Sequence, residues 1–284
     1  MRDVSILAKR ADVFRAARGF FDARGFTEVQ TPVRIPAPAP EEHIDCPQVV
    51  GADGSVTYLR ASPELQMKKL LAAGMDRIYQ IGPCFREGER GSRHRPEFTM
   101  LEWYRRGADY LAIADDMERM LRALGGEPFS APFRRLTVRE AYREFAGWDP
   151  WRGFDQDRFD FDMATKVEPA LGAIGGGVFL TDYPPQAASL AKLRGDVAER
   201  WEFYWNGIEL ANCFSELCDA GEQAARFKKA REARMQLGEA DYPIDAEFLS
   251  CLPRIGAAAG VAVGVDRLVM AMTGEATIAE ARVL

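Results

Sequence analysis

Residues 84–104, CFREGERGSRHRPEFTMLEWY, place a run of arginines and glutamates between two segments that favour β-strands. Side chains alternate between the two faces of a strand, so Thr99, Leu101 and Trp103 share a face that suits an apolar core. The opposite face mixes aromatic, apolar and acidic side chains: Phe98, Met100, Glu102 and Tyr104. If the two segments pair, Arg86 lies over this second face, which indicates a functional site. The alternative is an exposed hairpin with a solvated, charged loop.

The order of the predicted elements favours an α+β fold, an antiparallel β-sheet flanked by helices, in a single domain over residues 1–284. Apolar residues at helical spacing predict a helix over 5–24, and Ser62 followed by Pro63 predicts the start of another over 63–74. Further helices are predicted over 109–124 and 219–237, strands over 44–50, 55–59, 77–85 and 179–184, and only helices and loops over 125–176. Strands and helices do not alternate regularly, which argues against a doubly wound parallel sheet.

Composition excludes several function classes. The 284 residues carry a formal net charge of −6, which argues against a broad nucleic-acid-binding face. No apolar run approaches the roughly 20 residues that span a bilayer, and the N-terminus has no apolar signal core. We therefore expect a cytoplasmic protein without a membrane partner. Five cysteines without a C-x-x-C pair, and only two histidines, favour reduced thiols over a zinc site.

The segment RWEFYWNGIELANCF, residues 200–214, predicts a hairpin with its turn at Asn206-Gly207. A two-residue turn pairs Trp205 with Ile208, Tyr204 with Glu209, and Glu202 with Ala211. Glu202 and Glu209 then share a face as diagonal neighbours, about 7–8 Å apart at the backbone. Two such carboxylates need a positive partner, either a divalent cation shared with phosphate oxygens or a lysine or arginine.

Residues 260–274, GVAVGVDRLVMAMTG, predict a strand that leads into a helix. The helix begins near Asp266, so Arg267 lies in its first turn, where an arginine and a helix N-terminus together suit an anion. Close strand–helix packing with a surface arginine is the alternative. GAIGGG, residues 172–177, lacks the features of a P-loop or a dinucleotide fingerprint and predicts a flexible loop.

Three segments resemble, in order and spacing, the motifs of class II aminoacyl-tRNA synthetases. GFTEVQTPV resembles the first motif, which ends in a proline, here Pro32, at a dimer interface. FRE…RHRPEFTMLEWY resembles the second motif and GVAVGVDRL the third. ASPELQMKKLL, FLTDYP and GIELANCFSELCD are similar to segments of lysyl-tRNA synthetases.

The stand-alone core resembles the elongation factor P lysyltransferase family most. Lysyl-tRNA synthetases carry an anticodon-binding barrel before the core, whereas this chain enters the first motif almost at once, so no anticodon binding is expected. The resemblance implies a homodimeric ligase that uses ATP and Mg²⁺. It would activate lysine or (R)-β-lysine as an aminoacyl adenylate and transfer it to a lysine side chain of elongation factor P. Ala262 stands where synthetases usually have glycine, and it would narrow the pocket near the amino end of the substrate.

The resemblance also implies roles for individual residues, with Arg86 and Arg267 as the catalytic pair. Glu202 and Glu209 would hold magnesium. The ATP site would comprise Arg86, Glu87, Gly88, His94, Arg95, Phe98, Glu209, Leu210, Gly264 and Arg267. The amino-acid site would comprise Ser62, Pro63, Glu64, Glu102, Tyr104, Asn212, Glu216 and Ala262. Several carboxylates in that site suit a substrate with two ammonium groups, because a buried cation needs an anionic partner.

The sequence departs from the family pattern at four positions. Gly88 occupies the place of the usual glutamate of the second motif, where Glu87 or Glu89 could substitute, and Arg95 replaces a common asparagine. Cys213 and Ser215 replace the usual glycine and histidine. Two alternatives follow. One is a lysyl-tRNA-synthetase-like paralogue that activates α-lysine for another acceptor, and the other is a non-catalytic paralogue that binds a nucleotide or amino acid and regulates a partner.

Overall fold

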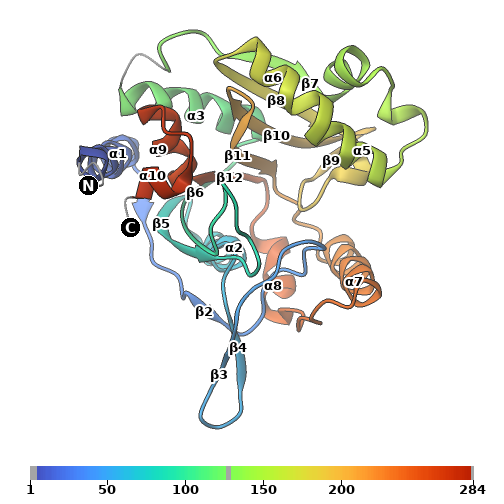
Figure 1. Ribbon diagram of the computed structural model, residues 1–284. Coiled ribbons are helices and arrows are strands. Elements are labelled where there is room, and N and C mark those ends of the chain that lie inside the picture. Colours follow the sequence, from blue (N-terminus) through green and yellow to red (C-terminus); the bar gives the residue numbers. More distant parts are fainter. Residues whose placement is uncertain (1–4, 126–128, 283–284) are drawn as a thin grey trace.

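A nine-stranded sheet forms the centre of the computed structural model, which describes residues 5–125 and 129–282 (Figure 1). The strands follow one another across the sheet in the order β1 (Thr27–Glu28), β5 (Arg77–Phe85), β6 (Glu97–Arg106), β12 (Ala258–Gly264), β11 (Ile208–Ser215), β10 (Val197–Trp205), β8 (Gly177–Tyr183) and β7 (Arg134–Thr137), with β9 (Leu193–Arg194) on β10. Neighbouring strands from β5 to β8 are antiparallel. The edge strand β1 pairs in parallel with β5, and the opposite edge strand β7 pairs in parallel with β8. The predicted α+β fold, an antiparallel sheet flanked by helices, is confirmed.

Four helices cover one face of this sheet: α1 (Ser5–Asp22), α3 (Tyr110–Leu124), α9 (Val265–Thr273) and α10 (Ile278–Arg282) (Figure 1). The largest apolar core lies between them and the sheet. Phe21 of α1 stacks on Tyr79 with ring centroids 4.6 Å apart and packs against Trp103 at 5.1 Å. Leu101 and Trp103 face this core, as the alternation along β6 predicts.

The other face of the sheet carries helices mainly at its two ends. One group comprises α2 (Glu64–Ala72), α7 (Ala220–Leu237) and α8 (Ala246–Cys251), and the other comprises α4 (Val138–Ala141), α5 (Gln156–Asp162) and α6 (Glu168–Ile174). Short 3-10 or π turns occupy Tyr142–Ala146, Pro150–Arg152, Met163–Val167, Pro185–Ala187 and Leu252–Arg254. Each group covers its own smaller apolar core. The middle of this face is polar and lies open.

A small three-stranded sheet projects from the body, with strand order β2 (Arg34–Ile35), β4 (Val56–Leu59) and β3 (Gln48–Val50) (Figure 1). It confirms the hairpin predicted around Asp53-Gly54, although the first strand begins at Gln48 rather than Ile44. The chain then enters α2 one residue later than predicted. Pro63, not Ser62, is the N-cap residue, yet the Ser62 Oγ still accepts a hydrogen bond from the backbone N–H of Glu64 at 3.0 Å.

The prediction of only helices and loops over 125–176 misses β7. This four-residue strand pairs in parallel with β8, more than 40 residues further along the chain, so nothing local marks it.

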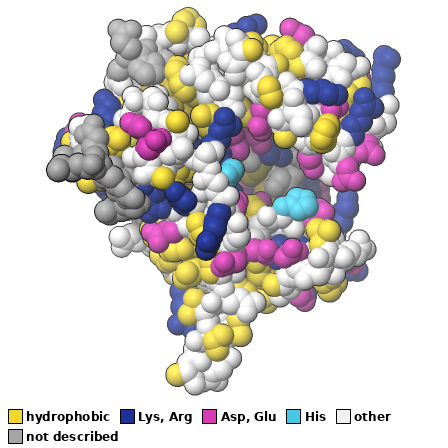
Figure 2. Space-filling model, in the orientation of Figure 1, with side chains coloured by type: hydrophobic (Ala, Val, Ile, Leu, Met, Phe, Trp, Pro, Cys, Tyr) yellow, Lys and Arg dark blue, Asp and Glu magenta, His cyan; other side chains and the backbone are white. Residues whose placement is uncertain are grey.

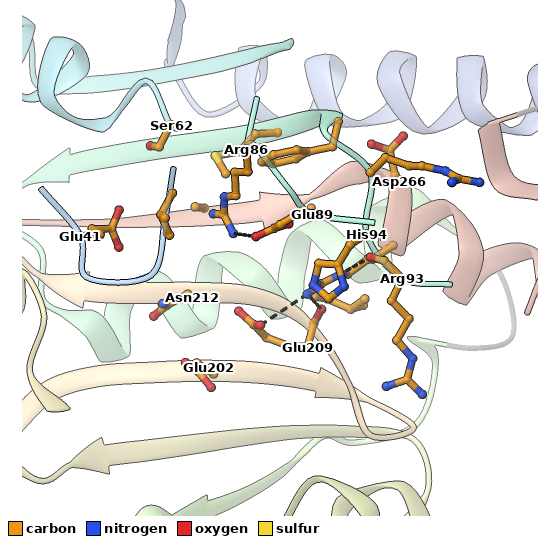
Figure 3. Close-up of a pocket in the computed structure, with 18 of the residues that line it drawn as sticks. Glu41, Ser62, Arg86, Glu89, Arg93, His94, Glu202, Glu209, Asn212 and Asp266 are labelled. Atoms are coloured by element: carbon orange, nitrogen blue, oxygen red, sulfur yellow. Dashed lines mark hydrogen bonds and ion pairs between the residues drawn. The ribbon is translucent and has the colours of Figure 1, made fainter. Parts of the chain in front are cut away.

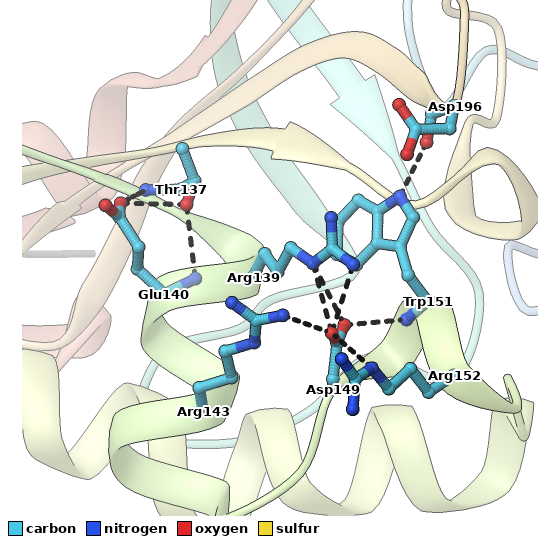
Figure 4. A network of polar contacts seen from close by, with 8 residues as sticks. All are labelled: Thr137, Arg139, Glu140, Arg143, Asp149, Trp151, Arg152 and Asp196. Atoms are coloured by element: carbon cyan, nitrogen blue, oxygen red, sulfur yellow. Dashed lines mark hydrogen bonds and ion pairs between the residues drawn. The ribbon is translucent and has the colours of Figure 1, made fainter.

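A polar network then anchors the helices that follow β7 (Figure 4). Asp149 accepts hydrogen bonds from Arg139 at 3.1 Å and Arg143 at 2.6 Å. Burial opposes ionisation of Asp149, but these two arginines outweigh it and lower its pKa to about 2.

The hairpin of β10 and β11 contains a β-bulge that the sequence does not predict. Trp205 pairs with Ile208 and Tyr204 with Glu209, as predicted, but the register then shifts by one residue. Glu202 therefore pairs with Asn212, and the predicted pairing with Ala211 is wrong. A bulge inserts one extra residue into a strand and so reverses the face of every residue beyond it. It brings Glu209 and Asn212, three residues apart, to the same face.

Two predictions about composition can be compared with the structure. In the described residues, no helix combines the length and apolar character needed to cross a bilayer. All five cysteines are free thiols, and only Cys218 is partly exposed.

Replacing Gly260 with alanine should destabilise the fold by about 1–3 kcal/mol, a typical cost of overpacking. Gly260 pairs with Tyr104, and an added Cβ would lie 2.2 Å from carbon atoms of that ring. Gly19 is the matched control, because it is exposed on α1 and an added Cβ there meets nothing within 4 Å. Gly19→Ala should stabilise by about 0.5–1 kcal/mol. Urea unfolding measures both variants, and an unchanged stability for Gly260→Ala would contradict this packing.

Candidate active site

A cavity of ≈380 Å³ opens in the middle of the polar face of the sheet. Figure 2 shows this face hollowed at its centre, with acidic side chains and histidine around the hollow. Thirteen of the predicted site residues line the cavity: Ser62, Glu64, Arg86, His94, Arg95, Phe98, Glu202, Glu209, Leu210, Asn212, Ala262, Gly264 and Arg267. The other six lie outside its wall: Pro63, Glu87, Gly88, Glu102, Tyr104 and Glu216. Of these six, Pro63, Glu102, Tyr104 and Glu216 are buried.

Arg86 lies at the end of β5 with its guanidinium carbon 5.2 Å from the ring centroid of Phe98 (Figure 3). Its Nη1 contacts Glu89 at a long 3.5 Å, and its buried Nε has no hydrogen-bond partner. The long contact with Glu89 leaves the guanidinium charge weakly compensated, so an anionic oxygen in the cavity beside Arg86 would be favourable. Glu89 rather than Glu87 faces Arg86, because Gly88 adopts a positive φ of 74° that turns the chain between them.

Arg267 stands in the first turn of α9 and joins three parts of the cavity wall. Its Nη1 donates to the backbone oxygen of Glu209 at 2.9 Å and approaches the Glu209 carboxylate at 3.4 Å. Its Nη2 lies 2.5 Å from Nε2 of His94. Burial and the charge of Arg267 lower the pKa of His94, so the neutral imidazole accepts this hydrogen bond. The charged loop is thereby tied to the start of α9.

Glu202 and Glu209 share the cavity face, as predicted, but Glu202 already has partners (Figure 3). Its two oxygens accept hydrogen bonds from Arg200 at 2.5 Å and from the Tyr204 hydroxyl at 2.6 Å. Arg200 also approaches Asn212 Oδ1 at 3.3 Å. Burial, and next the charge of Glu202, raise the pKa of Glu209, whereas Arg267 opposes this shift. A further cation near Glu209 would therefore be favourable.

The protein offers few ligands for a metal ion at this point. Within residues 5–125 and 129–282, no group of three or more histidine, cysteine, aspartate or glutamate side chains is arranged to hold one. Two carboxylates fit a hard divalent cation only if phosphate oxygens or waters complete its shell. Arg200 is the positive partner of Glu202, which is the arginine alternative that the sequence analysis offered beside a divalent cation.

The carboxylates predicted for the amino-acid site cluster at one end of the cavity. Glu102 accepts hydrogen bonds from the Ser62 hydroxyl at 2.9 Å and the Tyr104 hydroxyl at 2.5 Å. Burial, and next the charge of Glu64, raise the pKa of Glu102 to about 7. Lys68 of α2 lies between Glu64 and Glu216, with its Nζ 2.5 Å from a Glu64 oxygen and in contact with the Glu216 carboxylate.

A second cavity, of ≈570 Å³, adjoins the first and shares Glu41, Arg200, Glu202 and Glu209 with it. Its outer wall comes from the helices around 156–168, the loop at 183–190 and one face of α7. Gln223 of α7 lines it while only 1% exposed, and the Gln223 side-chain nitrogen has no hydrogen-bond partner. This cavity gives a second route from the surface to the carboxylates.

Sequence reasoning missed several residues of the cavity wall: Glu41, Ile44, Arg93, Arg200 and Asp266. Arg200 could have been found, because it lies two positions before Glu202 on the same strand face. Glu41 could not, since it lies in the proline-rich connector with no local pattern. Asp266 fixes the start of α9, because its carboxylate accepts hydrogen bonds from Arg10 at 2.6 Å and from the Thr99 N–H at 2.7 Å.

Comparison with known proteins supports the resemblance of the sequence. Residues 2–284 match the family model of class II tRNA synthetases (D, K and N). The chain belongs to this family. An elongation factor P–(R)-β-lysine ligase of Vibrio cholerae is 37% identical over 96% of this chain and 92% of its own length. Ligases of the same name from Pseudoalteromonas translucida and Proteus mirabilis are 37% and 36% identical, each over 98% of this chain and 94% of their own lengths.

Two departures from the pattern of this ligase family lie away from the site. Cys213 is buried in the large core on the far side of the sheet. The Ser215 Oγ accepts a hydrogen bond from the backbone N–H of Tyr110 at 2.9 Å. Both residues lie beyond the bulge on the face opposite Asn212, so they leave the polar face of the ligase fold intact. Arg95, in contrast, lines the cavity.

Replacing Arg200 with methionine should destabilise the protein by about 3–5 kcal/mol, because it leaves the Glu202 carboxylate buried without its cation. The side chains of Arg200 and Glu202 are only 15% and 11% exposed. Arg194, 60% exposed and 3.2 Å from Glu199, is the control, and Arg194→Met should cost no more than about 1 kcal/mol. Chemical denaturation compares the variants, and equal losses would show that Glu202 does not depend on Arg200.

Proposed function

We propose that this chain activates lysine or (R)-β-lysine with ATP and transfers the aminoacyl group to a lysine side chain of elongation factor P. One observation supports this most: the cavity has Arg86, whose charge is only weakly compensated, at one end and buried carboxylates at the other. The arginine end suits a triphosphate and the acidic end suits ammonium groups. The names of the relatives, which cover almost the whole chain, supply the acceptor and the β-amino acid.

In the proposed site, ATP occupies the end of the cavity formed by Arg86, His94, Arg95, Phe98 and Arg267. Adenine stacks on Phe98, and the guanidinium of Arg267 covers the other face of the base. Glu209, Leu210 and Gly264 add the floor of this site, and Glu87 and Gly88 shape the loop behind Arg86. Arg86, in the cavity wall, directs its guanidinium toward the α-phosphate.

The amino acid occupies the acidic end of the cavity, beside Ser62, Glu64 and Asn212. Behind them, Glu102, Tyr104 and Glu216 supply the buried negative charge, Pro63 sets the start of α2, and Ala262 narrows the floor. The positive charge of an ammonium group would favour the ionised forms of Glu102 and Glu216, whose pKa values burial raises.

The first step joins the substrate carboxylate to the α-phosphate and expels pyrophosphate. Arg86 and Arg267 stabilise the negative charge that develops on the phosphate oxygens, an electrostatic role that needs no covalent enzyme intermediate. Glu209, with Glu202 beside it, would hold Mg²⁺ together with phosphate oxygens, and the ion would neutralise charge on the leaving pyrophosphate.

The second step forms an amide bond between the aminoacyl group and the acceptor lysine. The neutral ε-amine attacks the carbonyl carbon of the adenylate, the bond to the phosphate oxygen breaks, and AMP leaves while the amine loses a proton. The acceptor must reach a carbonyl that lies between the two ends of the first cavity. The second cavity meets the first at Arg200, Glu202 and Glu209, so it supplies a path for the lysine side chain.

The wild-type protein should catalyse ATP–pyrophosphate exchange that depends on Mg²⁺ and on lysine or (R)-β-lysine, but not on aspartate or asparagine. Arg86→Ala should lower the exchange rate by about 10²–10³-fold, the usual cost of losing one charge-stabilising donor in a transition state. Intact-mass analysis of elongation factor P should then show one added aminoacyl group. Exchange with aspartate alone would contradict the proposal, and exchange without transfer would point to another acceptor.

Ala230→Trp should block transfer while leaving exchange intact, because Ala230 lines only the second cavity. We expect transfer to fall on the order of a hundredfold, since small displacements of a reacting group cost that much. Ala225→Trp, on the exposed side of the same helix, is the control and should change neither rate. Equal transfer by both variants would exclude this path.

Homodimer formation through the first motif, a single domain over residues 1–284, a cytoplasmic location and the absence of anticodon binding stay predictions. Sedimentation velocity tests the first of them directly, and a monomer at micromolar concentration would contradict it.

A further inference from the structure

Lys68 is a buried cation behind the acidic end of the first cavity. Its side chain is 1% exposed, and its Nζ lies 2.5 Å from Glu64 Oε1 and in contact with Glu216 Oε2. Glu64 and Lys68 are four residues apart on α2, a spacing that puts both on one face of a helix. Glu64 lines the cavity, whereas Glu216 is buried behind it. Lys68 therefore links a residue of the wall to a residue that is only 4% exposed.

The next residue, Lys69, shows what an ordinary ion pair on this helix is like. Its Nζ lies 2.8 Å from Asp245 and 2.6 Å from Glu247, toward α8 and away from the cavity. Its side chain is 18% exposed, and it lines neither cavity. The two lysines share their chemistry and helix, and they differ in which carboxylates they meet.

The position of Lys68 matters because buried carboxylates tend to keep their protons. Burial raises the pKa of Glu216 to about 8, and the charge of Lys68 opposes that shift. Burial alone would lower the pKa of Lys68, but Glu216 and Glu64 outweigh it and raise it, so the lysine stays charged. A protonated Glu216 could not form an ion pair with a substrate, whereas the lysine favours the ionised form.

We propose that Lys68 is a positioning residue of the amino-acid site, which holds Glu64 and Glu216 together as carboxylates, so that Glu64 in the cavity wall receives an ammonium group of a diamino acid and Glu216 behind it supplies negative charge. This inference rests on the proposed function. The charge count agrees with it. When all three are ionised, Glu64, Glu102 and Glu216 together with Lys68 carry a net charge of two negative units, and lysine and β-lysine each carry two ammonium groups.

The other titratable side chains that face Glu64, Lys68 and Glu216 are the same in the wild type and in the lysine variants. They are Glu41 on the connector, Glu102 and Tyr104 on β6, Cys213 and Cys218 at β11 and beyond it, and Lys192.

The test is the KM for lysine and (R)-β-lysine in ATP–pyrophosphate exchange, measured from pH 6 to pH 9. For the wild type, KM should fall as the pH rises through about 7–8, because the raised pKa values of Glu102 and Glu216 make their ionised forms prevail above that range. Lys68→Met should move this fall to higher pH and raise KM at pH 7 about tenfold or more, with kcat less affected. Lys69→Met should follow the wild-type curve, and Lys68→Arg should keep the wild-type midpoint.

A Lys68→Met curve with an unshifted midpoint, or a shift of the same size in Lys69→Met, would overturn the inference. If Lys68→Met does not fold, as thermal unfolding would show, Glu216→Gln decides, because removal of this titrating group should leave only the fall near pH 7 that comes from Glu102. Calorimetric binding of lysine separates the two proposals. Binding that weakens in Lys68→Met without any exchange by the wild type would refute the proposed function and support the role of Lys68, and no binding by the wild type would refute both.

Discussion

Compensation of buried charge is the constraint on which the rest of the site depends. Burying a carboxylate without a cation or hydrogen-bond donors costs several kcal/mol, so each acid on the polar face of the sheet needs a defined partner. Glu202 has Arg200 and Tyr204, Glu102 has Ser62 and Tyr104, and Glu216 has Lys68. Because these partners come from α2, β6 and β10, the charged groups tie the helices at one end of the sheet to its centre.

The compensation is unequal along the cavity. Arg86 keeps a buried Nε without a partner, and Glu209, beside Glu202, has a long ion pair of 3.4 Å with Arg267. At the acidic end, one lysine serves two glutamates. The cavity thus lacks an anion at one end and cations at the other. ATP and a diamino acid, side by side, would correct both imbalances, which is why binding and reaction can share one cavity.

The sequence predicts those parts of the site that follow from local periodicity. Alternation along EFTMLEWY separates the core face from the site face, the Asn-Gly turn predicts the hairpin, and the position of Arg267 follows from the strand-to-helix boundary. The bulge near Leu210 could not be predicted, because it depends on the packing of β11 between β10 and β12. The role of Lys68 could not be predicted either, because its partner Glu216 follows β11, far along the chain, and nothing local distinguishes Lys68 from other lysines on the helix.

A crystal structure of the protein with a non-hydrolysable lysyl adenylate analogue would test the central claim most directly. The account predicts the adenine between Phe98 and Arg267, and an ammonium group within hydrogen-bond distance of the carboxylates of Glu64, Glu102 or Glu216, with the salt bridges of Lys68 retained. An analogue whose lysyl group lies in the second cavity, or whose ammonium groups meet only solvent, would contradict it.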